Sequence, residues 1–200
     1  MGTAVATFSY AKAGYIIWKI AIFSVCASFL GATIGAHISL MISDYYFKFI
    51  LLLVLPVVAF FVMKDKDLGR QREAYSELKT ILLCIPISFA VGMYDAFYGP
   101  GTGTFLILLY TTVAHLPLNN ANGISKVVNL TSNVTSMIIF VINGTAIIRI
   151  GLIAGVCNMV ANYIGSNTFK KDGSKIVRPV MLIVLTIFSV KIILELLGLA

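Results

Sequence analysis

One ionisable side chain stands in the middle of a long apolar stretch. Asp95 lies within residues 80–113, just before the sequence Gly99-Pro100-Gly101-Thr102-Gly103-Thr104. An ionisable group at membrane depth is costly unless it is paired or hydrated, so it is a functional candidate by default. Glycine and proline should break a helix here, and the free N–H groups at the start of the second arm suit an anion. The alternative is a kink in which the aspartate caps its own broken backbone. The predicted anion-binding residues are Asp95, Gly99, Gly101, Thr102, Gly103 and Thr104.

Residues 122–141 carry a second set of polar side chains. Asn122, Lys126, Asn129 and Asn133 follow an i, i+4, i+7, i+11 spacing, which lines one face of a helix. A face of amides with one lysine cannot face lipid, so it must face another helix or a water-filled path. The amides can coordinate a small oxyanion while the lysine supplies charge. The plainer alternative is amide packing between helices, with an ion pair between Asp95 and the lysine. The predicted substrate-binding residues of this set are Lys126, Asn129 and Asn133, joined by Asn158 and Asn162 on a later span.

The composition indicates that these residues are positioned by membrane helices. The chain has 200 residues, of which 59% are hydrophobic and 12% charged, with a mean hydropathy of +0.96. Soluble domains average about 25% charged residues, so a water-soluble surface cannot be built from this sequence. We predict an all-α, polytopic membrane protein that is broken or re-entrant at residues 99–104. We predict about six apolar windows, each near or above the ~20 residues that a membrane helix needs. They are residues 15–36, 46–63, 80–113, 122–141, 147–166 and 177–197.

The basic residues fall mainly in two runs between apolar windows. The chain has 15 Lys and Arg against 8 Asp and Glu, which gives a formal net charge of +7. Cytoplasmic loops of membrane proteins carry such a bias. We therefore predict a multi-pass protein of a prokaryotic cytoplasmic membrane, with the lipid bilayer and a small anion as partners and no nucleic acid. A coupling proton or ion and self-association as a homo-oligomer are further expectations. The basic runs are Lys64, Lys66, Arg70, Arg72 and Lys79, and Lys170, Lys171, Lys175 and Arg178.

The cysteines give no sign of a metal or redox centre. Cys26, Cys84 and Cys157 lie far apart inside apolar windows and match no metal-binding or redox spacing. We expect neither a metal nor a cofactor.

The chain contains a weak internal repeat. Aligning the chain on itself without a gap places Gly14 on Gly144 and, in the same register, Gly35 on Gly165. We call this the repeat alignment. Duplicated units of transporters are either inverted or parallel. If residues 80–113 cross the membrane once, the repeat is parallel. If they form a re-entrant hairpin, the repeat is inverted and both basic loops share a side, and we favour this version. The predicted division is a remainder of the first repeat at 1–63, a charged cytoplasmic loop at 64–79 and a complete second repeat at 80–200.

Two strings of residues carry a resemblance to a known family. Gly92-x-x-Asp95-x-x-x-Gly99-Pro100-Gly101-Thr102-Gly103, followed by Lys126-Val127-x-Asn129-Leu130-x-Ser132-Asn133 and then Gly144, resembles the second half of the sulfite exporter TauE/SafE family of membrane transport proteins. Residues 14–60 resemble the end of that family's first half, whereas the family's N-terminal glycine-rich span is not matched. The resemblance implies a duplicated permease that moves sulfite, sulfonates or other small organosulfur anions. It also implies that Asp95, Gly99, Pro100, Gly101, Gly103, Lys126, Asn129 and Asn133 form the second-half signature.

Two other functions stay open on the sequence. One is a truncated or non-transporting membrane subunit, in which the helices pack but no path forms. The other is an intramembrane aspartyl protease, because Tyr94-Asp95 and a Gly-x-Gly turn resemble parts of such sites. That chemistry requires two carboxylates that share a proton, and the turn at residues 101–104 offers no second acid. We therefore expect a permease that works by alternating access, not an enzyme.

Overall fold

The computed structural model describes residues 2–43, 73–99, 101–146 and 148–172, together with the isolated residues 183, 186, 187, 190 and 194. Every regular element in these ranges is an α-helix, which confirms the predicted fold class. The helices are α1 (Gly2–Lys12), α2 (Trp18–Met41), α4 (Glu77–Phe97), α5 (Thr102–Thr112), α6 (Leu118–Ile142) and α7 (Ile148–Asp172).

The long helices match the predicted apolar windows. In the described part of the chain, four helical segments are long and apolar enough to cross a membrane: Trp18–Met41, Glu77–Phe97, Leu118–Ile142 and Ile148–Gly165. They correspond to the windows predicted at 15–36, 80–113, 122–141 and 147–166. The window at 46–63, most of the basic residues, and the window at 177–197 except for its five isolated residues lie outside the described residues.

The window at 80–113 is broken into two arms, as predicted, and the two arms run antiparallel. Ser88 on α4 hydrogen-bonds Tyr110 on α5 (2.7 Å between hydroxyl oxygens), and Tyr94 packs edge to face on Phe105. The later residue of α4 pairs with the earlier residue of α5, so the two arms run antiparallel and form a hairpin. After α5, His115 Nδ1 lies 2.9 Å from the carbonyl oxygen of Glu73, which brings the chain back beside the start of α4. At 1.5 Å per residue α5 is about 16 Å long, half of the ~30 Å hydrocarbon core. The chain thus leaves the hairpin beside the end of α4 at which it entered, which is the topology of a re-entrant segment.

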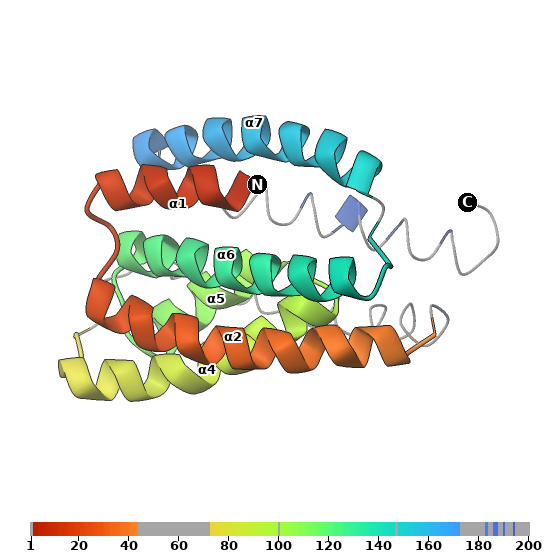
Figure 1. Cartoon of the computed structure of the whole chain (residues 1–200). Coiled ribbons are helices and arrows are strands. Elements are labelled where there is room, and N and C mark those ends of the chain that lie inside the picture. The colour runs from red at the N-terminus through yellow and green to blue at the C-terminus, as the bar shows by residue number, and fades with distance from the viewer. Residues whose placement is uncertain are drawn as a thin grey trace.

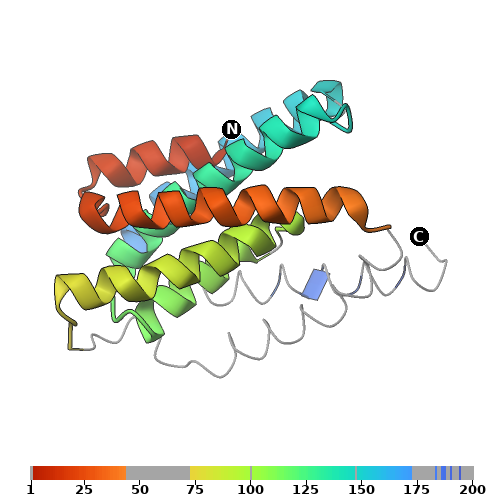
Figure 2. The same ribbon diagram turned by 60° about the horizontal axis from the view of Figure 1, so that its bottom comes forward.

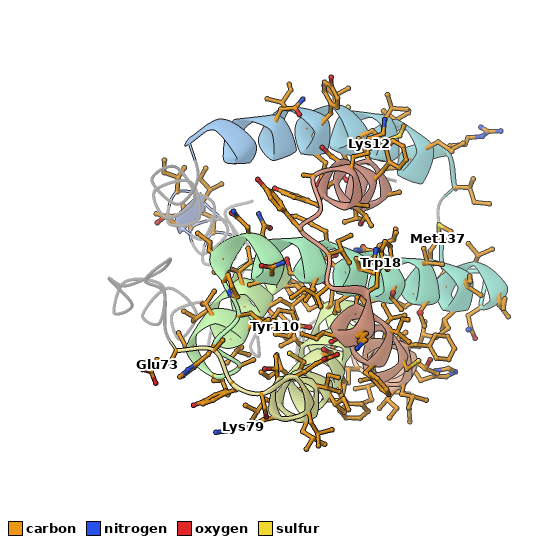
Figure 3. All side chains as sticks on the ribbon, turned by 90° about the vertical axis from the view of Figure 1, so that its left-hand side faces the viewer. Lys12, Trp18, Glu73, Lys79, Tyr110 and Met137 are labelled. Carbon is orange, nitrogen blue, oxygen red and sulfur yellow. The ribbon has the colours of Figure 1, made fainter. Side chains whose placement is uncertain are left out.

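Small residues set the packing of α2 on this hairpin. A Cβ atom added at Gly31 would collide with the carbonyl oxygen of Phe89, and one added at Gly35 would collide with that of Met93. On the facing helix, Gly92 lies directly against Ser28. Glycines at such positions let helix backbones approach closely, which is how membrane helices gain packing contacts. The main core lies between α2, α4, α5 and α6, with Tyr110 in its interior and Glu73 and Lys79 at the periphery (Figure 3).

Helix α1 was not predicted, and the repeat alignment places it on the second half of α6. The two turns that follow these helices have the same structure. Gly14 and Gly144 both have positive φ (72° and 68°). The Tyr15 N–H donates to the Tyr10 carbonyl, and at the equivalent position the Thr145 N–H donates to the Phe140 carbonyl. Each is the long bond of a Schellman motif, which closes a helix at a left-handed glycine.

The helices paired by the repeat alignment run in opposite directions. Figure 1 shows α2 running from left to right and α7 from right to left, while α6 runs parallel to α2. The last residues of α7 and the first residues of α4, which adjoin the two basic runs, lie at the same end of the bundle in this view and in Figure 2. This is the arrangement expected of an inverted repeat. The proposed division at residues 63 and 79 stays a prediction, since residues 44–72 lie outside the described part.

Candidate functional site

The turn between α4 and α5 is shaped by two glycines in the left-handed region. Gly99 has φ 90° and Gly101 has φ 81°, values that side chains with a Cβ atom adopt at a cost. Gly101 is the residue that precedes α5, so its backbone directs the first turn of that helix toward α4. The short turn places the last turn of α4, which carries Asp95, beside the first turn of α5.

Asp95 is held by hydroxyl groups from two other elements. The Thr102 hydroxyl, on α5, lies 2.7 Å from Asp95 Oδ1 and 2.6 Å from the Gly99 carbonyl oxygen. The Ser132 hydroxyl, on α6, donates to Asp95 Oδ2. Thr102 and Ser132 are almost completely buried, and Asp95 is half-buried. One carboxylate thus connects both arms of the hairpin to the neighbouring helix.

This geometry differs from both alternative roles considered for Asp95. Its side chain accepts hydrogen bonds from hydroxyls, not from the N–H groups of the broken backbone, so it does not cap the helix end. Within the described ranges, the ion pair observed is between Lys19 and Glu77 (3.1 Å), and Asp95 and Lys126 do not form one. A carboxylate with charge-assisted hydrogen bonds is stabilised without a basic partner.

The remaining predicted residues of the turn have unequal surroundings. Thr104 is buried in the first turn of α5. A Cβ atom added at Gly103 would meet no atom of the described residues within 4 Å, so these residues leave open space beside it. The first N–H groups of α5 have no partner inside the helix, and they carry the positive end of its dipole. Pro100, which the resemblance implies as part of the signature, lies outside the described residues.

The polar face of α6 is present, and its first half faces α1. The Asn122 side chain is buried and donates to the Tyr10 hydroxyl (3.0 Å). One turn later, the Thr7 hydroxyl lies 3.1 Å from the carbonyl oxygen of Lys126. The prediction that this face packs on another helix is therefore confirmed for its first half, and the helix is α1.

Two pairs of asparagines form matching local hydrogen bonds. Asn133 Nδ2 donates to the carbonyl oxygen of Asn129 (2.5 Å) and also contacts its side-chain oxygen. Asn162 Nδ2 lies 2.9 Å from the Asn158 carbonyl oxygen and 3.0 Å from its Oδ1. In each pair at least one side chain remains exposed. These amides therefore keep some donors and acceptors available for a ligand.

The structure does not gather all the predicted residues at one point. Asp95, Gly99 and Thr102 meet at the hairpin turn, and Lys126, Asn129 and Asn133 lie on the helix that the turn contacts through Ser132. Asn158 and Asn162, in contrast, contact α1 at Gly2. The donor that the site prediction omitted is Ser132. Its position three residues after Asn129 was a usable signal, because i and i+3 residues of a helix are neighbours.

No described group of three or more His, Cys, Asp or Glu side chains could hold a metal ion. The chemistry of the site is instead that of hydroxyls, amides, one carboxylate and one lysine. Such groups bind, orient and release a polar solute at membrane depth, where irregular backbone is tolerated only if protein buries it or if it lines a water-filled cavity.

Fold and site together define a multi-pass membrane protein with a re-entrant hairpin beside a polar helix face, an architecture used by membrane transporters. The sequence profile described as "Sulfite exporter TauE/SafE" matches residues 1–192. The chain belongs to this family of membrane transporters.

Curated relatives carry names of the same kind. The chain is 26% identical over 194 residues to a "Probable membrane transporter protein ORF9" of Sinorhizobium sp, covering 97% of this chain and 74% of the relative. It is 26% identical to "Probable membrane transporter protein YfcA" of Escherichia coli K12, and the match covers 86% of this chain and 64% of the relative. It is 28% identical to a "Probable membrane transporter protein" of Haemophilus influenzae, and that match covers 84% of this chain and 65% of the relative. The chain thus spans about two thirds to three quarters of the length of these relatives. No solved structure matches it significantly.

Proposed function

We propose that the chain is part of a permease for a small oxyanion of the sulfite or sulfonate class, and that it works by alternating access. The observation that carries the proposal is the Asp95 carboxylate, which joins the re-entrant hairpin to α6 through hydroxyl groups at the point where the helix is broken. Membership of the TauE/SafE family supports the substrate class.

The residues of the site have separate roles in this proposal. Asp95 repels anions, so its role is to fix the turn and not to bind the substrate. The favourable charge comes from Lys126 and from the start of α5, where the helix dipole and the backbone N–H groups of the first turn attract an oxyanion. Asn129 and Asn133 supply amide donors to the remaining oxygens. A sulfite or sulfonate group has three oxygens, which such convergent donors can engage together.

The hydrogen bonds of Asp95 indicate how the site could change its access. The bond from Thr102 lies within the hairpin, whereas the bond from Ser132 joins the hairpin to α6. If the second bond breaks, the hairpin can move against α6 with its own turn intact. This is the gating of one element against another that alternating access requires.

Flux in reconstituted vesicles tests the proposal. Purified protein is placed in liposomes, and the movement of radiolabelled sulfite and of a small alkanesulfonate is measured with and without a proton gradient. Asp95→Asn and Lys126→Ala should each abolish flux above that of protein-free vesicles. Lys79→Ala is the matched control, because Lys79 lies on the ring of Tyr75 (3.5 Å to its centroid), away from the hairpin turn.

Two results would count against the assignment. Unchanged flux in both variants would show that the proposed site takes no part in transport. Absence of flux in every preparation of folded protein would favour the second candidate, a non-transporting membrane subunit. A dependence of flux on the proton gradient would identify the coupling ion.

A further inference from the structure

The two hydroxyl groups that hold Asp95 each have a second acceptor within reach. The Thr102 hydroxyl lies 2.7 Å from Asp95 Oδ1 and 2.6 Å from the Gly99 carbonyl oxygen. The Ser132 hydroxyl contacts Asp95 Oδ2 and also lies 3.1 Å from the carbonyl oxygen of Asn129, one turn earlier on α6. A hydroxyl has one proton to donate, so each of the two can turn from the carboxylate to a backbone carbonyl.

This arrangement tolerates the loss of the negative charge on Asp95. Thr102 and Ser132 are only 2% and 1% exposed, so water has little room to replace a lost acceptor. A buried hydroxyl that is left without an acceptor is unfavourable. Because a backbone carbonyl already lies beside each hydroxyl, neither is left unpaired when the carboxylate becomes a neutral carboxyl group. The site is therefore compatible with both an ionised and a protonated aspartate.

No cation of the described residues holds Asp95 in its ionised form through an ion pair. Lys126 lies six residues before Ser132, almost two turns away along α6, and His37 Nδ1 lies 2.7 Å from the carbonyl oxygen of Thr33. The tyrosines nearby are neutral and supply no positive charge. A carboxylate that is buried without a cationic partner is able to take up a proton. The ionisable groups nearest to the hairpin turn on the helices around it are Tyr94 and Tyr98 at the end of α4, Tyr110 on α5, Lys126 on α6 and His37 on α2.

We propose that Asp95 is the proton-binding site of the transporter, and that the proton detaches the α4–α5 hairpin from α6 by releasing Ser132 to the carbonyl oxygen of Asn129. A proton from water forms an O–H bond at one carboxyl oxygen, and the charge of the side chain changes from negative to neutral. The Thr102 hydroxyl keeps its bond to Gly99, so the hairpin turn stays closed. The inference rests on the proposed function, because it names what breaks the bond between the hairpin and α6 during alternating access.

The proton also changes the charge that an anion meets at the site. An ionised Asp95 repels an oxyanion bound between Lys126 and the start of α5, whereas a neutral Asp95 does not. Proton and anion should therefore bind cooperatively. By thermodynamic reciprocity, each increases the affinity of the site for the other by the same factor.

Infrared spectroscopy of the purified full chain in detergent tests the proposal, because a protonated carboxyl group has a C=O band of its own. Spectra are recorded as the pH is lowered from about 9 to about 4, a range that ends near the ordinary pKa of an aspartate, with no sulfite or sulfonate present. The wild type should gain a band that Asp95→Asn lacks. Glu77→Gln is the matched control and should retain this band, because Glu77 is an exposed carboxylate of the same helix that pairs with Lys19 (3.1 Å).

Ser132→Ala tests whether the bond to α6 depends on the charge of Asp95. It removes a donor that stabilises the ionised form, so the Asp95 band should appear about one pH unit higher, which is about a tenfold gain in proton affinity. By the same reciprocity, this is the factor by which a proton weakens the bond. Ser136→Ala is its control, because the Ser136 hydroxyl donates to the Ser132 carbonyl (2.8 Å) on the same helix, and it should leave the pH unchanged.

Two results would overturn the proposal. One is identical spectra of the wild type and Asp95→Asn at every pH. The other is a band that appears at the same pH in the wild type and in Ser132→Ala, and this comparison holds even if Asp95→Asn does not fold. Adding an alkanesulfonate at fixed pH should strengthen the Asp95 band. If acid produces the band and the sulfonate does not change it, the proton site stands and the anion site of the proposed function fails.

Discussion

Thr102→Val removes one donor of the Asp95 carboxylate and changes little else. Valine has almost the same shape as threonine, so the volume at this almost completely buried position is conserved. The hydroxyl lies 2.7 Å from Asp95 Oδ1 and 2.6 Å from the Gly99 carbonyl oxygen, and both acceptors lose it together. Ser132 then remains as the hydroxyl donor to the carboxylate.

The magnitude follows from the charge on the acceptor. A hydrogen bond to a charged group contributes about 1.5–3 kcal/mol to stability, and a buried site gives water little room to replace it. Since about 1.4 kcal/mol corresponds to a factor of ten in an equilibrium constant, the equilibrium constant for folding should fall by roughly 10- to 100-fold. At about 2–4 °C per kcal/mol for a protein of this size, the unfolding midpoint in detergent should fall by roughly 3–12 °C.

Two controls identify the hydroxyl as the cause. Thr102→Ser keeps the hydroxyl and loses one methyl group, so its midpoint should lie closer to that of the wild type than that of the valine variant. Thr104→Val makes the same substitution two residues later, at a buried side chain that has no hydrogen bond to described residues. Its midpoint should change least. Equal midpoints for Thr102→Val and Thr104→Val would refute the role of the Thr102 hydroxyl.

Three further substitutions test the packing around the site. Gly35→Ala places a methyl group against the carbonyl of Met93; we expect a loss of about 1–3 kcal/mol, measured as a lower unfolding midpoint. Tyr10→Phe deprives the buried Asn122 amide of its acceptor; the expected cost is about 1–3 kcal/mol, and Asn122→Leu in the same background should recover part of it. Gly101→Ala forces a side chain into positive φ; it should cost about 1 kcal/mol or more and Gly101→Asn less, and equal midpoints for the two would contradict the assigned backbone conformation.

Much of the fold could be predicted because the bilayer imposes simple rules on a sequence. Apolar windows of about 20 residues become membrane helices, and α2, α6 and α7 each contain most of a predicted window. The break after Phe97 was predictable because glycines at residues 99 and 101 favour positive φ. The direction of the second arm was not, since a kinked single crossing has the same composition as a hairpin.

The element that the sequence analysis missed is α1, and its omission has a physical reason. Residues 2–12 are too few for a membrane span, and they include Ser and Thr residues that weaken the apolar signal. The repeat alignment nevertheless pointed to them, because it places them on residues 132–142 of α6. A repeat thus predicts a helix that hydropathy does not.

The candidate site was predicted in part. The functional importance of Asp95 follows from its cost at membrane depth, and the helical face of α6 follows from spacing alone. The partners of Asp95 depend on how α4, α5 and α6 meet in three dimensions. For this reason the sequence offered Lys126 as an ion-pair partner, whereas the structure has Thr102 and Ser132.

The most direct test of the account is whether the hairpin turn faces water at membrane depth. After Cys26, Cys84 and Cys157 are replaced by alanine, Gly103→Cys introduces one thiol at a position where the described residues leave open space. Phe29→Cys, at an exposed apolar position of α2, is the control that should face lipid. A membrane-impermeant maleimide is applied to sealed vesicles, with an alkanesulfonate as competitor, because sulfite itself consumes maleimide. We expect that the thiol at residue 103 reacts, that the sulfonate slows this reaction, and that the thiol at residue 29 does not react. A thiol at residue 103 that stays unreactive in folded protein, or that reacts at the same rate with and without sulfonate, would contradict a water-facing site at the hairpin turn.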